Sequence, residues 1–147
     1  MWKKNNRQFE VVNMPISNLK ELLCTIEPIL NKGVYVYSSV PFDFDISRLK
    51  PVAIFKELEG LTIITDEQNA IESNLDILFR AAWITLNVQS DLKAVGLTAA
   101  FSTALGDADI SCNVVAGAFH DHIFVPAEEA DKAMEVLLRL QRESKIC

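Results

Sequence analysis

Residues 83–126 have the sequence WITLNVQSDLKAVGLTAAFSTALGDADISCNVVAGAFHDHIFVP. Apolar and other residues alternate from 83 to 89, so Trp83, Thr85 and Asn87 share one face. A period of two residues is typical of a β-strand whose two faces differ. Apolar residues then recur at helical spacing from 97 to 105, and alternation returns at 110–116 and 119–125. The stretch is therefore predicted to form a strand, a helix and two further strands.

Residues 127–142 are predicted to form a second helix, with its own apolar stripe. Acidic residues crowd its first turn and basic residues lie near its end, which complements the helix dipole. The order from residue 83 is then βαββα, the ferredoxin-like arrangement without its last strand. An incomplete sheet has an open edge. We expect the first half of the chain to cover it, so that two small α+β units share edges or pack their antiparallel sheets together.

The first half is predicted to supply further strands and helices. Its expected elements are a strand at 9–14, a helix at 16–30 that Pro28 ends or kinks, a strand at 34–40, a loop at 41–50, strands at 51–58 and 61–65, and a helix at 66–73. Ser17 or Asn18 is the expected N-cap of the first helix. Glu59-Gly60 is typical of a hairpin turn between two strands.

The composition argues against several functional classes. Half of the 147 residues are hydrophobic, enough for a core in one ordinary domain or two very small ones. A net charge of −6, with basic residues clustered only between 3 and 7, argues against nucleic acid as a partner. Three cysteines predict a reducing compartment and no disulfide framework. Without a signal peptide or a membrane-spanning run, the expected location is the cytoplasm, away from membranes.

Several segments resemble the small tandem ACT-domain proteins, which are related to the regulatory modules of aspartate kinases. The segments are 83–86, 94–102, 110–117 and 120–126, and 55–62 resembles the matching part of the first module. The resemblance implies two βαββαβ-type modules, at 9–76 and 80–142. It also implies that an amino acid binds at an interface between modules, without catalysis or a cofactor. We expect a homo-oligomer, in particular a dimer.

The turn from Ser90 to Gly96 is the first candidate for a binding site. A helix start exposes unpaired backbone N–H groups, which suit a carboxylate, while Asp91 could hold an ammonium group. The alternative is that Ser90 or Asp91 only caps the helix. Together with the resemblance, these features predict the following ligand-binding residues: Ser90, Asp91, Leu92, Ala94, Val95, Gly96, Leu97, Asn113, His120 and His122.

His120 and His122 form a second candidate site, because residues two apart in a strand face the same way. Two imidazoles could chelate a metal ion, but Cys112 points to the apolar face and a third ligand is missing. We therefore expect no metal site. Ligand or interface contacts, or ordinary polar positions in a hairpin, are favoured over a catalytic histidine.

Three functional hypotheses follow from these patterns. The leading one is a regulatory module without catalytic activity that binds a small molecule, in particular an amino acid. The second is an assembly module that uses the same sheets to contact another protein and has no ligand. The third is an enzyme that uses the hairpin of His120 and His122, which would require a pocket where a histidine meets another titratable group.

Overall fold

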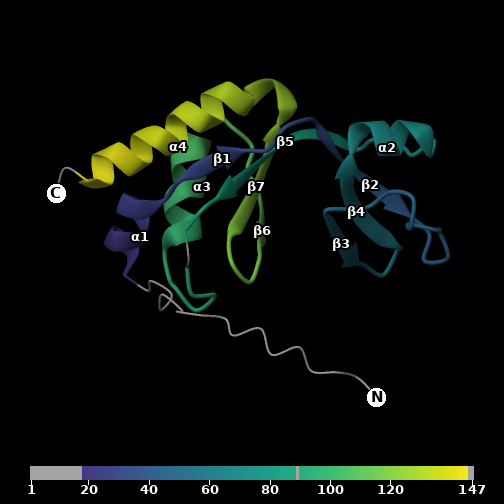
Figure 1. The fold of residues 1–147 in the computed structure, drawn as a ribbon, viewed down its shortest axis with the longest axis horizontal. Coiled ribbons are helices and arrows are strands. Elements are labelled where there is room, and N and C mark those ends of the chain that lie inside the picture. The colour runs from purple at the N-terminus through teal and green to yellow at the C-terminus, as the bar shows by residue number, and fades with distance from the viewer. Residues whose placement is uncertain (1–17, 89, 146–147) are drawn as a thin grey trace, which may run out of the picture.

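The computed structural model of the chain describes residues 18–88 and 90–145. The strand predicted at 9–14 and the possible cap Ser17 lie outside the described residues. The elements, shown in Figure 1, are α1 Leu19–Thr25, β1 Pro28–Leu30, β2 Tyr35–Val40, β3 Ala53–Lys56, β4 Leu61–Asp66, α2 Glu67–Glu72, β5 Phe79–Leu86, α3 Leu97–Asp107, β6 Asn113–Ala116, β7 Asp121–Pro126, the 3₁₀ turn η1 Ala127–Glu129 and α4 Ala130–Lys145.

The seven strands form one antiparallel sheet in the order β3-β4-β2-β5-β7-β6, with β1 also paired to β5. Strand β5 is long enough to pair with two different strands along one of its edges. Its first residues, 79–81, pair with β2, and its last residues, 84–86, pair with β1. Along its other edge it pairs with β7 from residue 81 to residue 86. One strand therefore joins the two halves of the sheet.

Each half of the sheet then has the complete ferredoxin-like strand order. The N-terminal half runs β5-β2-β4-β3, and the C-terminal half runs β1-β5-β7-β6. The missing last strand of the C-terminal unit is β1, which the first half supplies. The prediction of α+β units that share an antiparallel sheet is thus confirmed, and the shared strand is β5.

The first helix is shorter than the predicted span of 16–30. Helix α1 ends at Thr25, and Pro28 is the first residue of β1 instead of a kink within a helix. Proline lacks the N–H that a helix interior requires, whereas it is tolerated at the start of a strand. At the other end Asn18 is the N-cap, as expected, because its side chain accepts from the backbone N–H groups of Lys20 and Glu21.

Several strands in the structure are also shifted or shorter than predicted. Strand β3 covers 53–56 of the predicted 51–58, β6 covers 113–116 of 110–116, and β7 begins at 121 instead of 119. Ile110 does not enter the sheet because its N–H donates to the carbonyl of Leu105 and its side chain is buried. Asp109 has a φ of 60°, which turns the chain away from α3.

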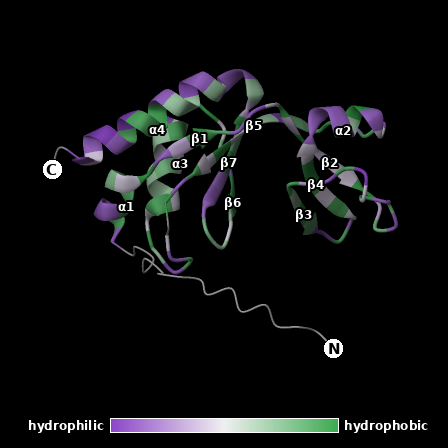
Figure 2. Cartoon of the chain, viewed as in Figure 1, coloured by the Kyte–Doolittle hydropathy of each residue, from purple (hydrophilic) through white to green (hydrophobic). Residues whose placement is uncertain are grey.

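The main core lies between the C-terminal half of the sheet and helices α1, α3 and α4. Phe101 of α3 is fully buried there with Leu22 of α1, Ile84 of β5 and Leu137 of α4. Figure 2 shows hydrophilic and hydrophobic segments alternating along α4, as expected for a helix with one face on a core. Helix α2 lies at the other end of the molecule, against β2 and β4.

The opposite face of the sheet carries a row of aromatic rings. Tyr35 and Trp83 have ring centroids 5.1 Å apart, Trp83 and Phe124 6.1 Å, and Phe124 and Tyr37 5.7 Å. All members of this apolar cluster come from strands. The rings therefore belong to a sheet face that the helices do not cover, and we call them the aromatic row: Tyr35, Trp83, Phe124 and Tyr37.

Candidate functional site

The turn between β5 and α3 lies at the same end of the sheet as the turn between β6 and β7. The register pairs Leu86, the last residue of β5, with Asp121, the first residue of β7. Figure 1 shows both turns at the lower edge of the molecule. The structure therefore brings the predicted residues of the segment 90–97 to the same end of the sheet as His120.

Asp91 organises its own turn. Its Oδ1 accepts from the N–H of Lys93 at 2.8 Å, and its carbonyl accepts from the N–H of Ala94, also at 2.8 Å. It does not cap α3, whose N-cap residue is Gly96 and whose first turn receives no side-chain hydrogen bond. Asp91 is therefore not the cap of α3, and its side chain accepts a hydrogen bond within the turn before the helix.

Gly96 is required by the backbone. Its φ is +100°, and a Cβ at this position would lie 2.9 Å from Cδ2 of Leu19. Around it, Leu92 and Val95 are 68% and 83% exposed, whereas the Leu97 side chain is buried in the core. Leu97 can thus contribute to a site at this end of the sheet only through its backbone.

His122 is held in a polar network on the face of the aromatic row. Its Nδ1 accepts from the indole N–H of Trp83 at 3.0 Å and lies 3.2 Å from Oγ1 of Thr85. Nδ2 of Asn31 donates to the same Thr85 oxygen at 2.9 Å. Because an indole nitrogen only donates, Nδ1 of His122 must carry a lone pair, and the ring proton of the neutral form lies on Nε2.

His120 does not share this arrangement. It lies in the turn before β7, where the N–H of Gly117 donates to its carbonyl at 2.9 Å. Its Nδ1 is buried and has no hydrogen-bond partner within the described part of the chain. Strand β7 begins at Asp121, so His120 lies just before the strand in which the alternation was predicted. Within residues 18–88 and 90–145, no three metal-ligating side chains come together.

Asn113 lies apart from the turn at 90–96. It is the first residue of β6 and pairs with Phe124, whereas Ala116, at the other end of β6, pairs with Asp121 near that turn. Three residues of strand separate the two positions by about 10 Å. Asn113 instead lines a separate cavity together with Tyr37 and Phe55.

Burial lowers the pKa of the His122 imidazole from its ordinary 6.5, and the nearby His120 acts in the same direction, while Asp121 opposes both. A histidine with a lower pKa in the folded state binds fewer protons there than in the unfolded chain. Its protonation therefore destabilises the fold, and stability is lost as the pH falls through the unfolded pKa towards the folded one.

We expect the free energy of unfolding to decrease between about pH 8 and pH 5, and to decrease less in His122→Gln. Glutamine keeps an amide oxygen that can accept from Trp83 but does not titrate. Urea unfolding of both proteins across this range measures the difference. Burial raises the pKa of Asp121 and the charge of His122 lowers it, so the substitution also changes the titration of this carboxyl. The comparison is therefore made above the pH range in which Asp121 titrates. Parallel curves would show that His122 has the same pKa in both states.

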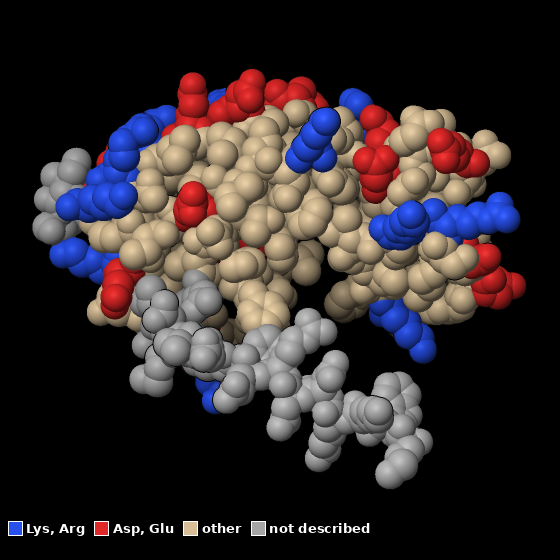
Figure 3. Space-filling view, in the orientation of Figure 1, with Lys and Arg blue, Asp and Glu red and all other residues tan. Residues whose placement is uncertain are grey.

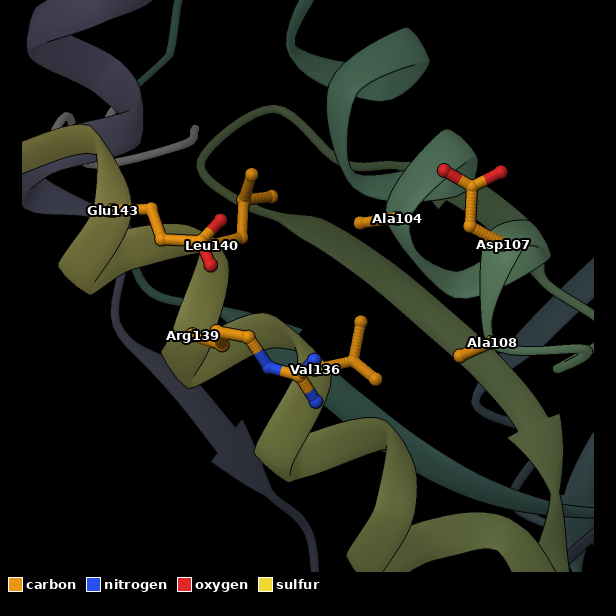
Figure 4. Close-up of a pocket in the computed structure, with 7 residues that line it drawn as sticks. All are labelled: Ala104, Asp107, Ala108, Val136, Arg139, Leu140 and Glu143. Carbon is orange, nitrogen blue, oxygen red and sulfur yellow. The ribbon is translucent and has the colours of Figure 1, made fainter.

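A groove between α3 and α4 lies at the other end of α3 from the predicted site. Its volume is about 340 Å³, and Figure 4 shows the side chains that line it: Ala104, Asp107, Ala108, Val136, Arg139, Leu140 and Glu143. The small side chains of Ala104 in α3 and of Ala108, its C-cap, leave the space, and charged groups of both helices surround it. None of the predicted ligand-binding residues lines this groove.

The partners of His122 were only partly recognisable in the sequence. Alternation placed Trp83 and Thr85 on the right strand face, but not opposite His122, because the register depends on the turn that joins the elements. Asn31 is 54 residues from Thr85 and gave no signal. Tyr37, whose pKa burial raises to about 12, was likewise not identified as a functional residue.

Two matches to the ACT domain cover most of the chain, one at residues 14–82 and one at residues 79–139. Both contain residues of β5, in agreement with its position in both halves of the sheet. No match to the chain was found among curated proteins.

Solved structures that are similar to this chain include the following three. A protein of unknown function from Vibrio cholerae, described as a possible transport protein, is 42% identical, matched over 84% of this chain and 95% of that one, with a TM-score of 0.77. A protein from Agrobacterium tumefaciens is 17% identical over 79% and 89%, with a TM-score of 0.63. The ligand-free regulatory subunit of aspartate kinase from Thermus thermophilus is 10% identical over 79% and 97%, with a TM-score of 0.58.

The last two similarities show the fold alone, because both identities are low. The two tandem domain matches agree with the two ferredoxin-like units that share β5. The chain therefore belongs to the ACT-domain family.

Proposed function

We propose that this protein is a regulatory module without catalytic activity that binds a small amino acid at the segment 90–97. The observation that carries this proposal is the start of α3, which no side chain caps and which follows the turn of Asp91. Membership of the ACT-domain family supports a regulatory role, since the similar structures include regulatory subunits of aspartate kinases.

The two charged groups of an amino acid have separate partners in this arrangement. The ligand carboxylate lies on the backbone N–H groups around Val95, Gly96 and Leu97, where the helix dipole favours negative charge. The ammonium group pairs with Asp91. A carboxylate has about four acceptor positions, so the bond from Lys93 leaves Asp91 able to accept others. His120 lies at the rim, whereas His122 and Asn113 take part only if the ligand extends along β6 and β7.

An assembly role is the second candidate. Leu92 and Val95 are the most exposed apolar side chains around the turn, and such residues are typical of surfaces that contact another module. We propose a homodimer in the cytoplasm, built from units at 9–76 and 80–142, with the exposed turn at an interface. The thiols of Cys24 and Cys112 are free, which suits a reducing compartment.

A catalytic role for the hairpin is not favoured. Nδ1 of His122 already accepts from Trp83, and no acidic side chain is a hydrogen-bond partner of His122 among the described residues. The Thr85 hydroxyl beside it accepts a hydrogen bond from Asn31. No helix in the described part of the chain is long and apolar enough to cross a membrane.

We expect Asp91→Asn to weaken binding of the amino acid about tenfold to a hundredfold, since a hydrogen bond to a charged group contributes about 1.5–3 kcal/mol. Asparagine keeps an oxygen that can accept from Lys93, so the turn itself is preserved. A thermal-shift screen of the proteinogenic amino acids first identifies the ligand. Calorimetric titration of that ligand then compares the variant with the wild type.

Asp45→Asn provides a matched control for this experiment. Asp45 also organises a local turn, with its Oδ1 accepting from the N–H of Ser47 at 3.0 Å, but it lies between β2 and β3. The Asp45→Asn substitution should leave the affinity for the amino acid unchanged. Equal affinities of Asp91→Asn and the wild type would remove Asp91 from the site. No heat with any amino acid would favour the assembly role.

Gly96 is unsuitable for this test because its substitution would disturb Leu19 and the backbone.

A further inference from the structure

The two end strands of the sheet, β3 and β6, face one another across a hollow. Figure 1 shows the sheet curled so that these edges approach, and Figure 3 shows the surface hollowed between them. The cavity there has a volume of about 390 Å³. We call it the edge cavity, and the residues that line it are Tyr37, Ala53, Ile54, Phe55, Thr62, Ile64, Cys112, Asn113, Val114 and Val115.

The lining of the edge cavity is uncharged. Among the described residues that line it, none is aspartate, glutamate, lysine or arginine, and most are aromatic or aliphatic. A charged group placed there would lose water without gaining a partner of opposite charge, which is strongly unfavourable. The volume falls within the range of about 300–1,000 Å³ that is typical of small-molecule sites. The edge cavity therefore suits a neutral ligand and not a zwitterionic amino acid.

Four lining residues have polar side-chain groups: Tyr37, Thr62, Cys112 and Asn113. The Thr62 hydroxyl already donates to the Glu57 carboxylate, which leaves the Tyr37 hydroxyl, the Asn113 amide and the Cys112 thiol. Burial raises the pKa of Tyr37 to about 12, so its phenol stays protonated at neutral pH. Among the described residues, no hydrogen bond uses this hydroxyl, unlike that of Tyr35, which donates to the carbonyl of Lys32. A half-buried hydroxyl without a partner is available to orient a ligand.

An aromatic ring is the apolar group that the edge cavity accommodates best. Tyr37 is in edge-to-face contact with Phe79 and with Phe124, so the aromatic row continues into the cavity. Phe55 stands at the rim of the cavity and is 71% exposed, although its ring is fully apolar. A planar ligand between them would gain aromatic contacts on two sides.

A protein strand is a poorer occupant of this space. Strands β3 and β6 have four residues each, and edges this short limit the pairing of an added strand. A stable protein partner also requires about 800 Å² of contact on each side, which a hollow between two short edges does not provide. A small molecule, by contrast, fills a concave site of this size.

We propose that the edge cavity binds a small uncharged aromatic molecule, with its ring against Phe55 and Tyr37 and a polar atom at the Tyr37 hydroxyl or the Asn113 amide. This site is distinct from the turn at 90–97. It requires neither Asp91 nor the start of α3, so it does not depend on the amino acid site.

Indole and L-tryptophan are suitable probes because they share one ring system and differ in charge. NMR titration of the full-length protein with indole should give saturable shifts in the backbone amides of 53–55 and 113–115. L-Tryptophan should bind there at least about tenfold more weakly, since its charged groups find no partner. Shifts confined to residues 90–97, or no saturable shift with indole, would overturn the proposal.

Phe55→Ala and Phe119→Ala form a matched pair of variants. The two rings are 71% and 74% exposed, so neither substitution should unfold the protein, but only Phe55 lines the edge cavity. Phe55→Ala should weaken indole binding about tenfold through the lost ring contact, and Phe119→Ala should not change it. Equal losses in both variants would overturn the proposal.

Tyr37→Phe tests the polar contact separately. It should weaken the binding of indole, whose N–H can donate to the Tyr37 oxygen, and leave the binding of 1-methylindole unchanged.

A second copy of the chain is the other possible occupant of the edge cavity. Analytical sedimentation of the wild type and of Phe55→Ala tests this by measuring whether each protein is a monomer or a dimer. A dimer that dissociates on Phe55→Ala and excludes indole from the edge cavity would also overturn the proposal.

Discussion

Phe101→Ala should lower the free energy of unfolding by about 3–5 kcal/mol, the usual cost of emptying a buried aromatic site. Phe101 is fully buried at the centre of the main core, where α1, α3 and α4 meet the C-terminal half of the sheet. The neighbouring side chains come from four different elements, so no single one can move to fill the space. The cavity should therefore remain largely open, which places the expected loss in the upper part of this range.

Equilibrium unfolding in urea, followed by far-UV circular dichroism, measures this loss. Phe119→Ala is the matched control, because the same ring is removed from a side chain that is 74% exposed. Its effect should stay within about 0.5 kcal/mol, the usual range for surface substitutions. A loss of that size for Phe101→Ala as well would mean that the apolar stripe of α3 does not face the core.

The C-terminal half could be predicted from the sequence because its elements carry strong periodic patterns. Alternation identified β5 and β7, and the apolar stripes of α3 and α4 gave their buried faces, including Phe101. In these segments local preference and burial agree, which is the condition under which sequence patterns are informative. The missing last strand then predicted that the two units share edges or pack their sheets together, and the resemblance implied that both units are ACT modules.

The beginning of the described chain was harder to predict because its local pattern conflicts with its final position. Leu22 and Ile26 follow a helical spacing that continues towards Leu30, so the sequence predicted one helix through 16–30. In the structure, residues 28–30 pair with β5 and complete the C-terminal half of the sheet. That pairing joins segments more than 50 residues apart, and no local preference encodes such a contact.

The candidate site was predicted only where it consists of contiguous residues. The turn at 90–96 and the start of α3 lie in one segment, so glycine and aspartate at fixed spacing identified them. The network of His122, Trp83, Thr85 and Asn31 joins four separate positions in two strands and a turn. Its geometry depends on the register of β5 with β7, which the sequence did not provide.

A fragment of residues 80–147 should fail to fold into a stable unit. It retains β5, β6, β7, α3 and α4 but lacks β1, which pairs with β5 through residues 28–30. It also lacks α1, whose Leu22 is fully buried against the same core as Ile84 and Phe101. The fragment would expose the edge of β5 and an apolar face of the main core together, and both features promote aggregation.

We expect this fragment to be insoluble, or to have far-UV but little near-UV circular dichroism, as molten states do. The control is a permuted chain that begins at residue 80, runs to residue 145 and continues through a flexible linker into residues 18–31. Sγ of Cys24 in α1 donates to the carbonyl of Ser144 at 2.9 Å, so the end of α4 lies beside α1 and a short linker can join them. This permuted chain restores α1 and β1 and should regain near-UV signal and dispersed amide resonances. A sharply folded, monomeric fragment of residues 80–147 would contradict the shared sheet as a condition for folding, because its core would then be stable without α1 and β1.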